Sequence, residues 1–271
     1  MKGLHYGLLL LIIALVGACA TSPTGRSQLM LISPETAIVE SEKAYIHTVS
    51  TLSKENKLVN DPAINQRVQA ITGRVVNVAM QRYPRTRNWK WSVAVIDDAE
   101  TVNAWAMAGG RMAVYTGLLE QLKLTDAELA QIMGHEIAHA LANHTAEQMS
   151  VALATQLGVT AVGAATDASD STLTIGAIAA QLGVQLPNSR TAESEADLIG
   201  IELAARAGYD PQAAVTLWQK MAKVSGKGPP QFLSTHPAPG NRQATLSALV
   251  PKMRQLQPAT LGPVAPVTLA R

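Results

Sequence analysis

Apolar residues spaced three and four positions apart predict several long amphipathic helices in this chain. The first begins with Ser33 as its N-cap and Pro34 as its first helical residue. Asp61 and Pro62 repeat this start signal before a second long apolar stripe. The helices predicted outside the strongest signal cover residues 34–52, 62–83, 117–124, 189–207, 211–223 and 241–255.

Strand signals are fewer and lie close together. The segment from Trp91 to Ile96 alternates and is rich in β-branched residues, which is typical of a strand. Residues 102–107 and 111–115 flank Ala108-Gly109-Gly110, and this connection predicts a β-hairpin. Many helices with few strands predict an α+β fold that is mainly α, with a small antiparallel sheet.

The strongest helix signal carries chemistry. Thr125 and Glu128 form a capping box, and an apolar stripe follows at helical spacing. His135, Glu136 and His139 fall at the edge of this stripe in the pattern HExxH. Histidines four residues apart lie on one helix face, so both imidazoles can bind one metal ion. Glu136 would then lie beside the open position of the metal, where it can take a proton from water.

A catalytic zinc ion needs a third protein ligand and one free position. Glu193 and Asp197 are four apart on a second predicted helix, so one carboxylate can bind zinc while the other orients a ligating histidine. Glu195 points away from that face and is expected to be solvated. His144 lies nearly opposite His135 on the helical wheel, so we expect it beside the site or at the surface, not as a ligand.

These motifs belong to a longer ordered set. The set comprises Asn103-Ala104-Trp105-Ala106, Gly109-Gly110, Thr116-Gly117-Leu118-Leu119, the HExxH pattern, Glu193-x-x-x-Asp197, and His236-Pro237 followed by Arg242. It spans about residues 95–245, over half of the chain. On these motifs the chain resembles metallopeptidase family forty-eight, the group with HtpX, the CAAX prenyl endopeptidases, the Oma-type mitochondrial proteases, BepA and LoiP. It resembles the periplasmic members, LoiP and the protease domain of BepA, more than HtpX and the CAAX proteases, which have several membrane-spanning helices.

The resemblance implies a zincin-like (gluzincin) metalloprotease domain with one Zn²⁺ per chain. It implies His135, His139 and Glu193 as zinc ligands, Glu136 as general base, Asp197 as the support of a ligand, and His236 and Arg242 as residues that reach the site from a C-terminal loop. For His236 two roles stay open at this point. It either stabilises the tetrahedral intermediate or caps the zinc as a reversible fourth ligand.

The hairpin also bears on function. A protease must hold an extended substrate beside its metal, and the exposed edge of a sheet does so through main-chain hydrogen bonds. Asn103, Ala104, Trp105 and Ala106 are the expected substrate-binding edge. The alternative is an interior strand without substrate contact.

The N-terminus predicts export and lipidation. Residues 1–18 read as a signal peptide, because Lys2 precedes an apolar run that is too short to be a permanent membrane anchor. Residues 16–19 resemble a bacterial lipobox, so Cys19, the only cysteine of the chain, is the expected lipidation site. Ala20 after it is typical of outer-membrane sorting. The alternative is an ordinary signal peptide with an incidental cysteine.

The mature chain is expected to form one domain over residues 34–257, after a lipidated tether over 19–33 and before a disordered tail over 258–271. Residues 158–188 are nearly free of charge and are expected to form either a lid over the cleft or two short buried helices. The formal net charge of +2 excludes the electrostatic footprint of a nucleic-acid-binding protein.

The sequence therefore predicts a zinc endopeptidase of the bacterial cell envelope, lipid-anchored on the periplasmic face of the outer membrane. Its expected substrates are unfolded or misassembled envelope proteins, an expectation that rests on the resemblance and the location. Two alternatives stay open. One is a zinc-containing envelope chaperone or assembly factor with latent or minor proteolysis. The other is a surface lipoprotein with a structural metal, which needs His236 as a permanent fourth ligand.

Overall fold

The computed structural model describes residues 19–165, 190–224, 230–237 and 240–270, and the side chains of 159–165 are not among them. Helices dominate it, so the predicted α+β, mainly helical class is confirmed. The elements that surround the sheet are α2 (Pro34–Lys54), α3 (Pro62–Arg82), the 3₁₀ helix η1 (Pro84–Asn88), α4 (Thr116–Gln121), α5 (Asp126–Leu141), α6 (His144–Ala165), a helix over 190–206, α8 (Gln212–Lys223), α9 (Gln231–Thr235) and α10 (Arg242–Arg254).

The helices begin where their capping residues predict. The side chain of Ser33 accepts a hydrogen bond from the backbone of Thr36 at the start of α2. The Thr125 hydroxyl accepts from the backbone of Glu128, whose carboxylate in turn accepts from the backbone of Thr125, so the predicted capping box is present. Such caps act within one helical turn and are therefore readable from local sequence.

The main sheet is mixed, not wholly antiparallel. Its strands are β3 (Ser92–Ile96), β4 (Ala104–Met107), β5 (Arg111–Tyr115) and β6 (Thr268–Leu269), in the order β4-β5-β3-β6. The predicted hairpin pairs β4 with β5 antiparallel, whereas β3 runs parallel to both β5 and β6. Gly109 and Gly110 in the connection both have φ of +80°, a conformation that glycine adopts without strain. Among the residues described, strand β4 lies at the edge of this sheet and not in its interior, so the alternative of an interior strand is wrong.

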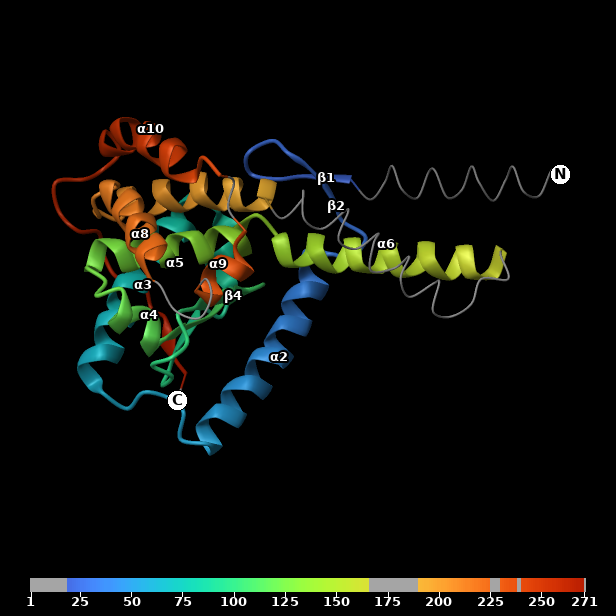
Figure 1. Cartoon of the computed structure of the whole chain (residues 1–271), viewed down its shortest axis with the longest axis horizontal. Helices are drawn as coiled ribbons and strands as arrows, with labels where there is room; N and C mark the ends of the chain where they lie inside the picture. The colour runs from blue at the N-terminus through green and yellow to red at the C-terminus, as the bar shows by residue number, and fades with distance from the viewer. Residues whose placement is uncertain (1–18, 166–189, 225–229, 238–239, 271) are drawn as a thin grey trace.

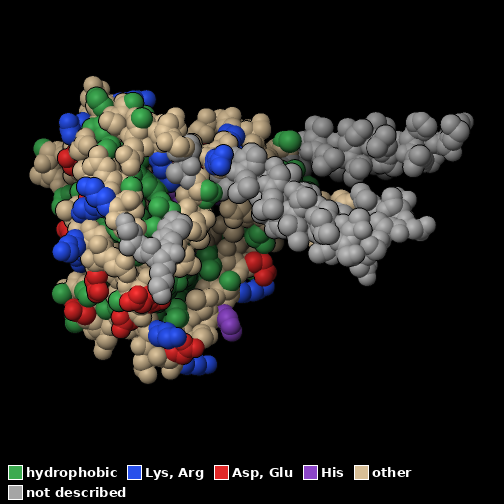
Figure 2. All heavy atoms as spheres, in the orientation of Figure 1, with side chains coloured by type: hydrophobic (Ala, Val, Ile, Leu, Met, Phe, Trp, Pro, Cys, Tyr) green, Lys and Arg blue, Asp and Glu red, His purple; other side chains and the backbone are tan. Residues whose placement is uncertain are grey.

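A single large core joins the sheet to α3, α5, the 190–206 helix, α8 and α10. Figure 1 shows these helices gathered in one body, with α2 running diagonally along its side and α6 projecting away from it. The space-filling view in Figure 2 shows both basic and acidic side chains distributed over the same face. Of the helices within the described ranges, none is both long enough and apolar enough to cross a membrane.

The predicted tether over 19–33 is folded against the domain. Its residues form β1 (Cys19–Thr21) and β2 (Ser27–Leu29), which pair antiparallel as a hairpin, β1–β2. Gln28 is buried and donates to the backbone carbonyl of Ala142, at the end of α5. Polar composition suggested a short tether, and the structure shows that polar side chains of this segment meet polar partners inside the fold. The signal peptide over 1–18 lies outside the described residues.

The predicted disordered tail over 258–271 is wrong for the residues described. The tail returns to the sheet, where β6 pairs with β3, and the side chains of Ala265 and Val267 are buried. Three prolines suggested disorder, but they leave enough donors for one short edge strand. Residues 166–188 of the expected lid or helix pair lie outside the described residues, and α6 extends to Ala165.

This packing makes a testable difference between two valines of the same segment. Val267→Ala should lower the free energy of unfolding by about 2 kcal/mol, because it removes buried methyl groups. Val264→Ala should change it by less than about 0.5 kcal/mol, since Val264 is 49% exposed. Urea unfolding followed by circular dichroism measures both. Equal, negligible effects would mean that the tail is not part of the core.

Candidate metal centre

The first two imidazoles of the site come from α5. His135 and His139 project from one face of this helix, one turn apart, and their Nε2 atoms are 3.0 Å apart. Both rings are largely buried, with side chains 7% and 13% exposed. The helical spacing inferred from the sequence thus aims both Nε2 atoms at one point.

The 190–206 helix reaches this point through a very close helix crossing. Gly134 precedes His135 on α5, and it meets Gly200 of the second helix. A Cβ added to Gly134 would lie 2.7 Å from the carbonyl oxygen of Gly200, and one added to Gly200 would lie 2.7 Å from the backbone nitrogen of His135. No side chain therefore separates the two backbones, and Glu193 and Asp197 come within hydrogen-bond distance of the imidazoles.

A fourth group joins from the C-terminal loop. His236 follows the short helix α9, and its ring stacks on Phe232 with centroids 4.3 Å apart. Its Nδ1 lies 3.1 Å from Glu193 Oε1 and 3.3 Å from His135 Nε2. Its Nε2 lies 3.3 Å from Glu136 Oε1. The ring thus stands between the metal-ligand cluster and the expected general base.

Together these four groups fit a tetrahedral cation. Among the residues described, one ligand atom each of His135, His139, Glu193 and His236 lie within 4.8 Å of one another. The closest ligand-atom pairs are 3.0 to 3.4 Å apart. A tetrahedral ion with bonds of about 2.0–2.1 Å holds its ligands about 3.3–3.4 Å apart, so little movement is needed to admit zinc. Three nitrogens and one carboxylate also suit zinc chemically.

The charges of the site are arranged around Glu193. Burial favours its neutral form, but hydrogen bonds with the three histidines hold the pKa of this carboxyl well below its usual range. Burial lowers the pKa of a histidine, yet Asp197 and Glu193 raise the pKa of His135 to about 9. For Glu136 burial dominates and raises the pKa, with His236 opposing it. Glu193 is therefore an anion, and Glu136 is a stronger base than a solvated carboxylate.

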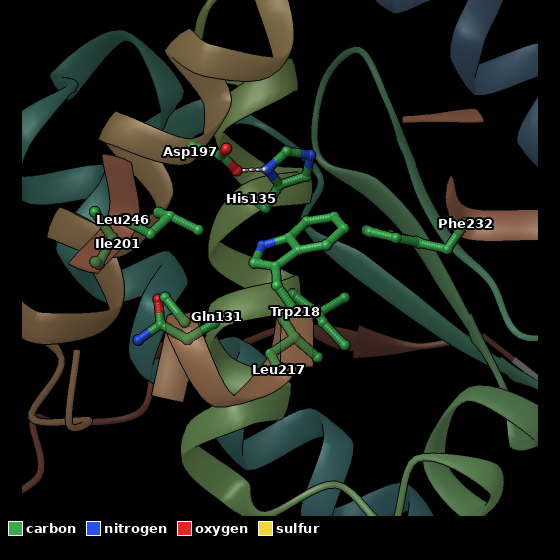
Figure 3. Close-up of a pocket in the computed structure, with 10 residues that line it drawn as sticks. Gln131, His135, Asp197, Ile201, Leu217, Trp218, Phe232 and Leu246 are labelled. Carbon is green, nitrogen blue, oxygen red and sulfur yellow. Dashed lines mark hydrogen bonds and ion pairs between the residues drawn. The ribbon is translucent and has the colours of Figure 1, made fainter. Parts of the chain in front are cut away.

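Asp197 and Arg242 lie behind His135. The carboxylate of Asp197 is 3.0 Å from His135 Nδ1, on the side of the ring opposite the cluster. Arg242 donates to Asp197 Oδ1 at 2.5 Å, and its guanidinium lies 3.5 Å from the centre of the Trp218 ring. Figure 3 shows Asp197 bonded to His135 and the indole of Trp218 beside that ring. His135, Asp197 and Trp218 are among the residues that line a cavity of about 20 Å³, large enough for about one water molecule.

The predicted substrate-binding segment borders the site. The backbone N–H of Ala106 lies against the carboxylate of Glu136, where it lowers the pKa of that group. Asn103 is buried, and its side-chain oxygen accepts from the backbone of Ala104. Trp105 packs edge-to-face on Tyr45 of α2. Strand β4 therefore runs beside Glu136, the expected general base, and its Trp105 side chain is directed to α2.

Of two further residues, one differs from its expected environment and the other lies beside the site, one of the two places expected for it. Glu195, predicted to be solvated, is 4% exposed and accepts from His144. His144, expected beside the site or at the surface, is buried, and its Nδ1 lies 2.8 Å from Nδ1 of His139. The helical wheel gives the direction of Glu195 on its own helix, but it does not show that Thr24 and Arg26 of another segment cover that face. His144 starts α6 after a bend at Asn143, whose φ is 56°.

Gly134 and Gly200 were not identified from sequence. The available signal was a glycine inside each metal-binding helix, which costs about 1 kcal/mol relative to alanine and therefore points to a packing reason. The close crossing supplies that reason.

The chain is similar to known proteins over the region that contains these residues. A model described as "Peptidase family M48" matches residues 62–250. The bovine protein named "Metalloendopeptidase OMA1, mitochondrial" is 33% identical over 264 residues, which cover 93% of this chain and 50% of that protein. A Vibrio cholerae "Putative beta-barrel assembly-enhancing protease" is 28% identical over 256 residues, covering 89% of this chain and 50% of that protein.

The Escherichia coli protein named "Beta-barrel assembly-enhancing protease" is 28% identical over 209 residues, covering 73% of this chain and 41% of that protein. The chain thus spans about half the length, or less, of these relatives. The predicted resemblance to Oma-type proteases and to the protease domain of the assembly-enhancing protease is confirmed.

The glycine crossing generates a prediction. Gly200→Ala should destabilise the fold by about 1–3 kcal/mol and weaken zinc binding by about tenfold or more, because the added carbon forces the two ligand-bearing helices apart. The matched control is Gly158→Ala in α6, where a Cβ meets nothing within 4 Å. It should be neutral or stabilising by up to about 1 kcal/mol. Thermal unfolding and a chelator competition assay measure both effects, and equal zinc affinity in the two variants would contradict the prediction.

Proposed function

The chain belongs to peptidase family M48, and from this membership and the geometry of the site we propose that it is a zinc-dependent endopeptidase. The observation that carries the proposal is the cluster of His135, His139, Glu193 and His236 with Glu136 at its edge. A structural site would need no general base, whereas here a buried carboxylate lies next to the ligands. That arrangement favours hydrolysis.

Each protein group then has a definite task. A bound zinc ion supplies Lewis acidity toward a carbonyl oxygen and lowers the pKa of water to about 7. Glu136 takes the proton of the attacking water and delivers it to the leaving amine. Its raised pKa suits both steps, because the carboxyl must accept a proton and then give it up.

Positioning falls to the residues behind the ligands. Asp197 holds the ring of His135 through Nδ1, which leaves Nε2 for the metal. Arg242 is bonded to Asp197 and covered by Trp218, so we assign it to holding that carboxylate. Neither Arg242 nor the capping His236 is assigned to the developing oxyanion, whose charge a bound zinc ion would stabilise.

His236 occupies the place that substrate and water need. Its Nδ1 lies among the ligand atoms while Nε2 approaches Glu136. We therefore favour the cap: His236 acts as a reversible fourth ligand in a resting state and must swing away before catalysis. His236, the residue before Pro237, has φ −121° and ψ 71°, outside the α-helical region that a following proline disfavours, and α9 ends there.

Strand β4 is proposed to hold the substrate. As the free edge of the sheet it offers main-chain groups along the carboxylate of Glu136. A peptide added there in extended form would pair by backbone hydrogen bonds, which read little sequence. Such binding suits unfolded or misassembled proteins, the substrate class proposed here.

The location is proposed from the N-terminus. Cys19 is exposed at the start of β1, so its side chain is accessible for acylation. We propose a lipid-anchored protein of the bacterial cell envelope, on the periplasmic face of the outer membrane. Fatty-acid labelling of the chain in cells, and its loss in Cys19→Ser, tests the anchor. Label retained by Cys19→Ser would refute it.

Removal of the general base is the decisive test of the activity. Glu136→Gln should keep stoichiometric zinc and lose cleavage of unfolded casein by about 10²–10⁴-fold. Glu202→Gln is the control, because this residue of the 190–206 helix is partly exposed, and the variant should cut like the parent. A parent that keeps casein soluble without cutting it would favour the chaperone or assembly-factor alternative.

Whereas loss of Glu136 should abolish cleavage, loss of His236 should increase it if His236 caps the metal. His236→Ala should raise the rate of casein cleavage by about tenfold, because the fourth position no longer needs to be vacated. His47→Ala, an exposed histidine on α2, should leave the rate unchanged. Steady-state cleavage at saturating zinc measures it. A fall in kcat would instead assign His236 to the transition state.

A further inference from the structure

A series of buried polar side chains connects the N-terminal β1–β2 hairpin to the proposed metal site. Glu195 is buried on the 190–206 helix, two residues from Glu193, and both of its oxygens are used. Oε1 accepts from the Thr24 hydroxyl at 2.6 Å. Oε2 accepts from Arg26 Nε and lies 3.1 Å from His144 Nε2. Both Thr24 and Arg26 belong to the loop of the β1–β2 hairpin.

His144 lies between Glu195 and His139, which is a proposed zinc ligand. Its Nδ1 lies 2.8 Å from Nδ1 of His139, whose Nε2 faces the metal cluster. A ligand nitrogen must be unprotonated, so His139 carries its proton on Nδ1 and donates it to His144. His144 must then be protonated on Nε2, which faces Glu195. One proton arrangement therefore satisfies the whole line from Glu195 to His139.

Arg26 makes the burial of Glu195 possible. Its guanidinium also binds Glu147 through two bonds of 2.6 Å, so one cation lies between two buried carboxylates. Gln28 of the same hairpin donates to Glu147 and to the backbone carbonyl of Ala142. A buried carboxylate without such partners is costly. The hairpin therefore supplies a cation in direct contact with both buried carboxylates.

The arrangement parallels that of the other helical ligand. Asp197 bonds directly to Nδ1 of His135 and is held by Arg242. Glu195 acts on Nδ1 of His139 through one intervening imidazole and is held by Arg26. Each histidine of the HExxH pattern is thus supported by a carboxylate of the 190–206 helix, and an arginine from a distant segment holds each carboxylate.

We propose that the β1–β2 hairpin is a working part of the metal centre, in which Arg26 and Glu195 position His139 through His144. The inference rests on the proposed zinc function and adds positioning residues to it. It also makes metal binding depend on the segment that directly follows Cys19. Figure 1 shows β1 and β2 beside the start of α6, where this contact is made.

The test uses the full chain in detergent with three readouts. Zinc affinity is measured by competition with a chelating indicator, the ligand field by the visible spectrum of the Co²⁺-loaded protein, and the histidine tautomers by ¹⁵N NMR. Glu195→Gln and Arg26→Met should each weaken zinc binding by about 10–100-fold and shift the Co²⁺ spectrum. In the parent, His139 should carry its proton on Nδ1 and His144 on Nε2.

Matched controls come from the same helix. Glu202→Gln and Arg206→Met break a partly exposed ion pair of 2.8 Å on the 190–206 helix and should change neither affinity nor spectrum. A merely structural role of Arg26 would lower the unfolding temperature without moving the Co²⁺ spectrum. If Glu195→Gln does not fold, Arg26→Met decides the matter, since the Arg26 side chain is 17% exposed.

Two failures are distinguishable. A parent that binds no zinc and cuts nothing overturns the proposed function. A parent that binds zinc and cuts casein, with Arg26→Met and Glu195→Gln binding zinc within twofold of it, overturns only the hairpin's role. A proton found on Nδ1 of His144 overturns it equally.

Discussion

The structure depends on the contact between two helix backbones at Gly134 and Gly200. Any side chain at either position would fall within 2.7 Å of the opposite backbone. The resulting approach brings the carboxylate of Glu193 within 3.4 Å of both imidazole nitrogens on α5. A site whose bonds are about 2 Å long tolerates little displacement, so the two glycines determine whether it exists. Glycine destabilises each helix relative to alanine, and this loss is required for the two backbones to come so close.

Burial of charge is the second constraint. Three acidic residues of one helix, Glu193, Glu195 and Asp197, are nearly or fully buried. A buried carboxylate is stable only with hydrogen-bond donors and opposite charge close by. The donors are histidines, but the permanent cations, Arg26 and Arg242, come from opposite ends of the chain. The fold therefore closes around its acidic helix from both termini, and a divalent cation would complete the balance at Glu193.

Local sequence predicted much of this and failed in an instructive way. The capping box of Thr125 and Glu128 and the glycine hairpin were confirmed, because each acts between residues a few positions apart. Composition predicted a tether and a disordered tail for these two segments, but Gln28 and Val267 are buried there. One buried residue in a polar or proline-rich segment leaves no periodic signal. Its partner lies more than a hundred residues away in the chain.

The sequence by itself determined the helix that carries His135, Glu136 and His139, since period and capping place these side chains on one face without reference to the rest of the chain. It also limited the acidic third ligand to one helical turn, between Glu193 and Asp197. Only the tertiary structure decided that Glu195 faces inward, that His144 touches His139 and that Arg26 reaches both. Those outcomes depend on how separate elements pack, and packing is a property of pairs of segments that no single segment encodes.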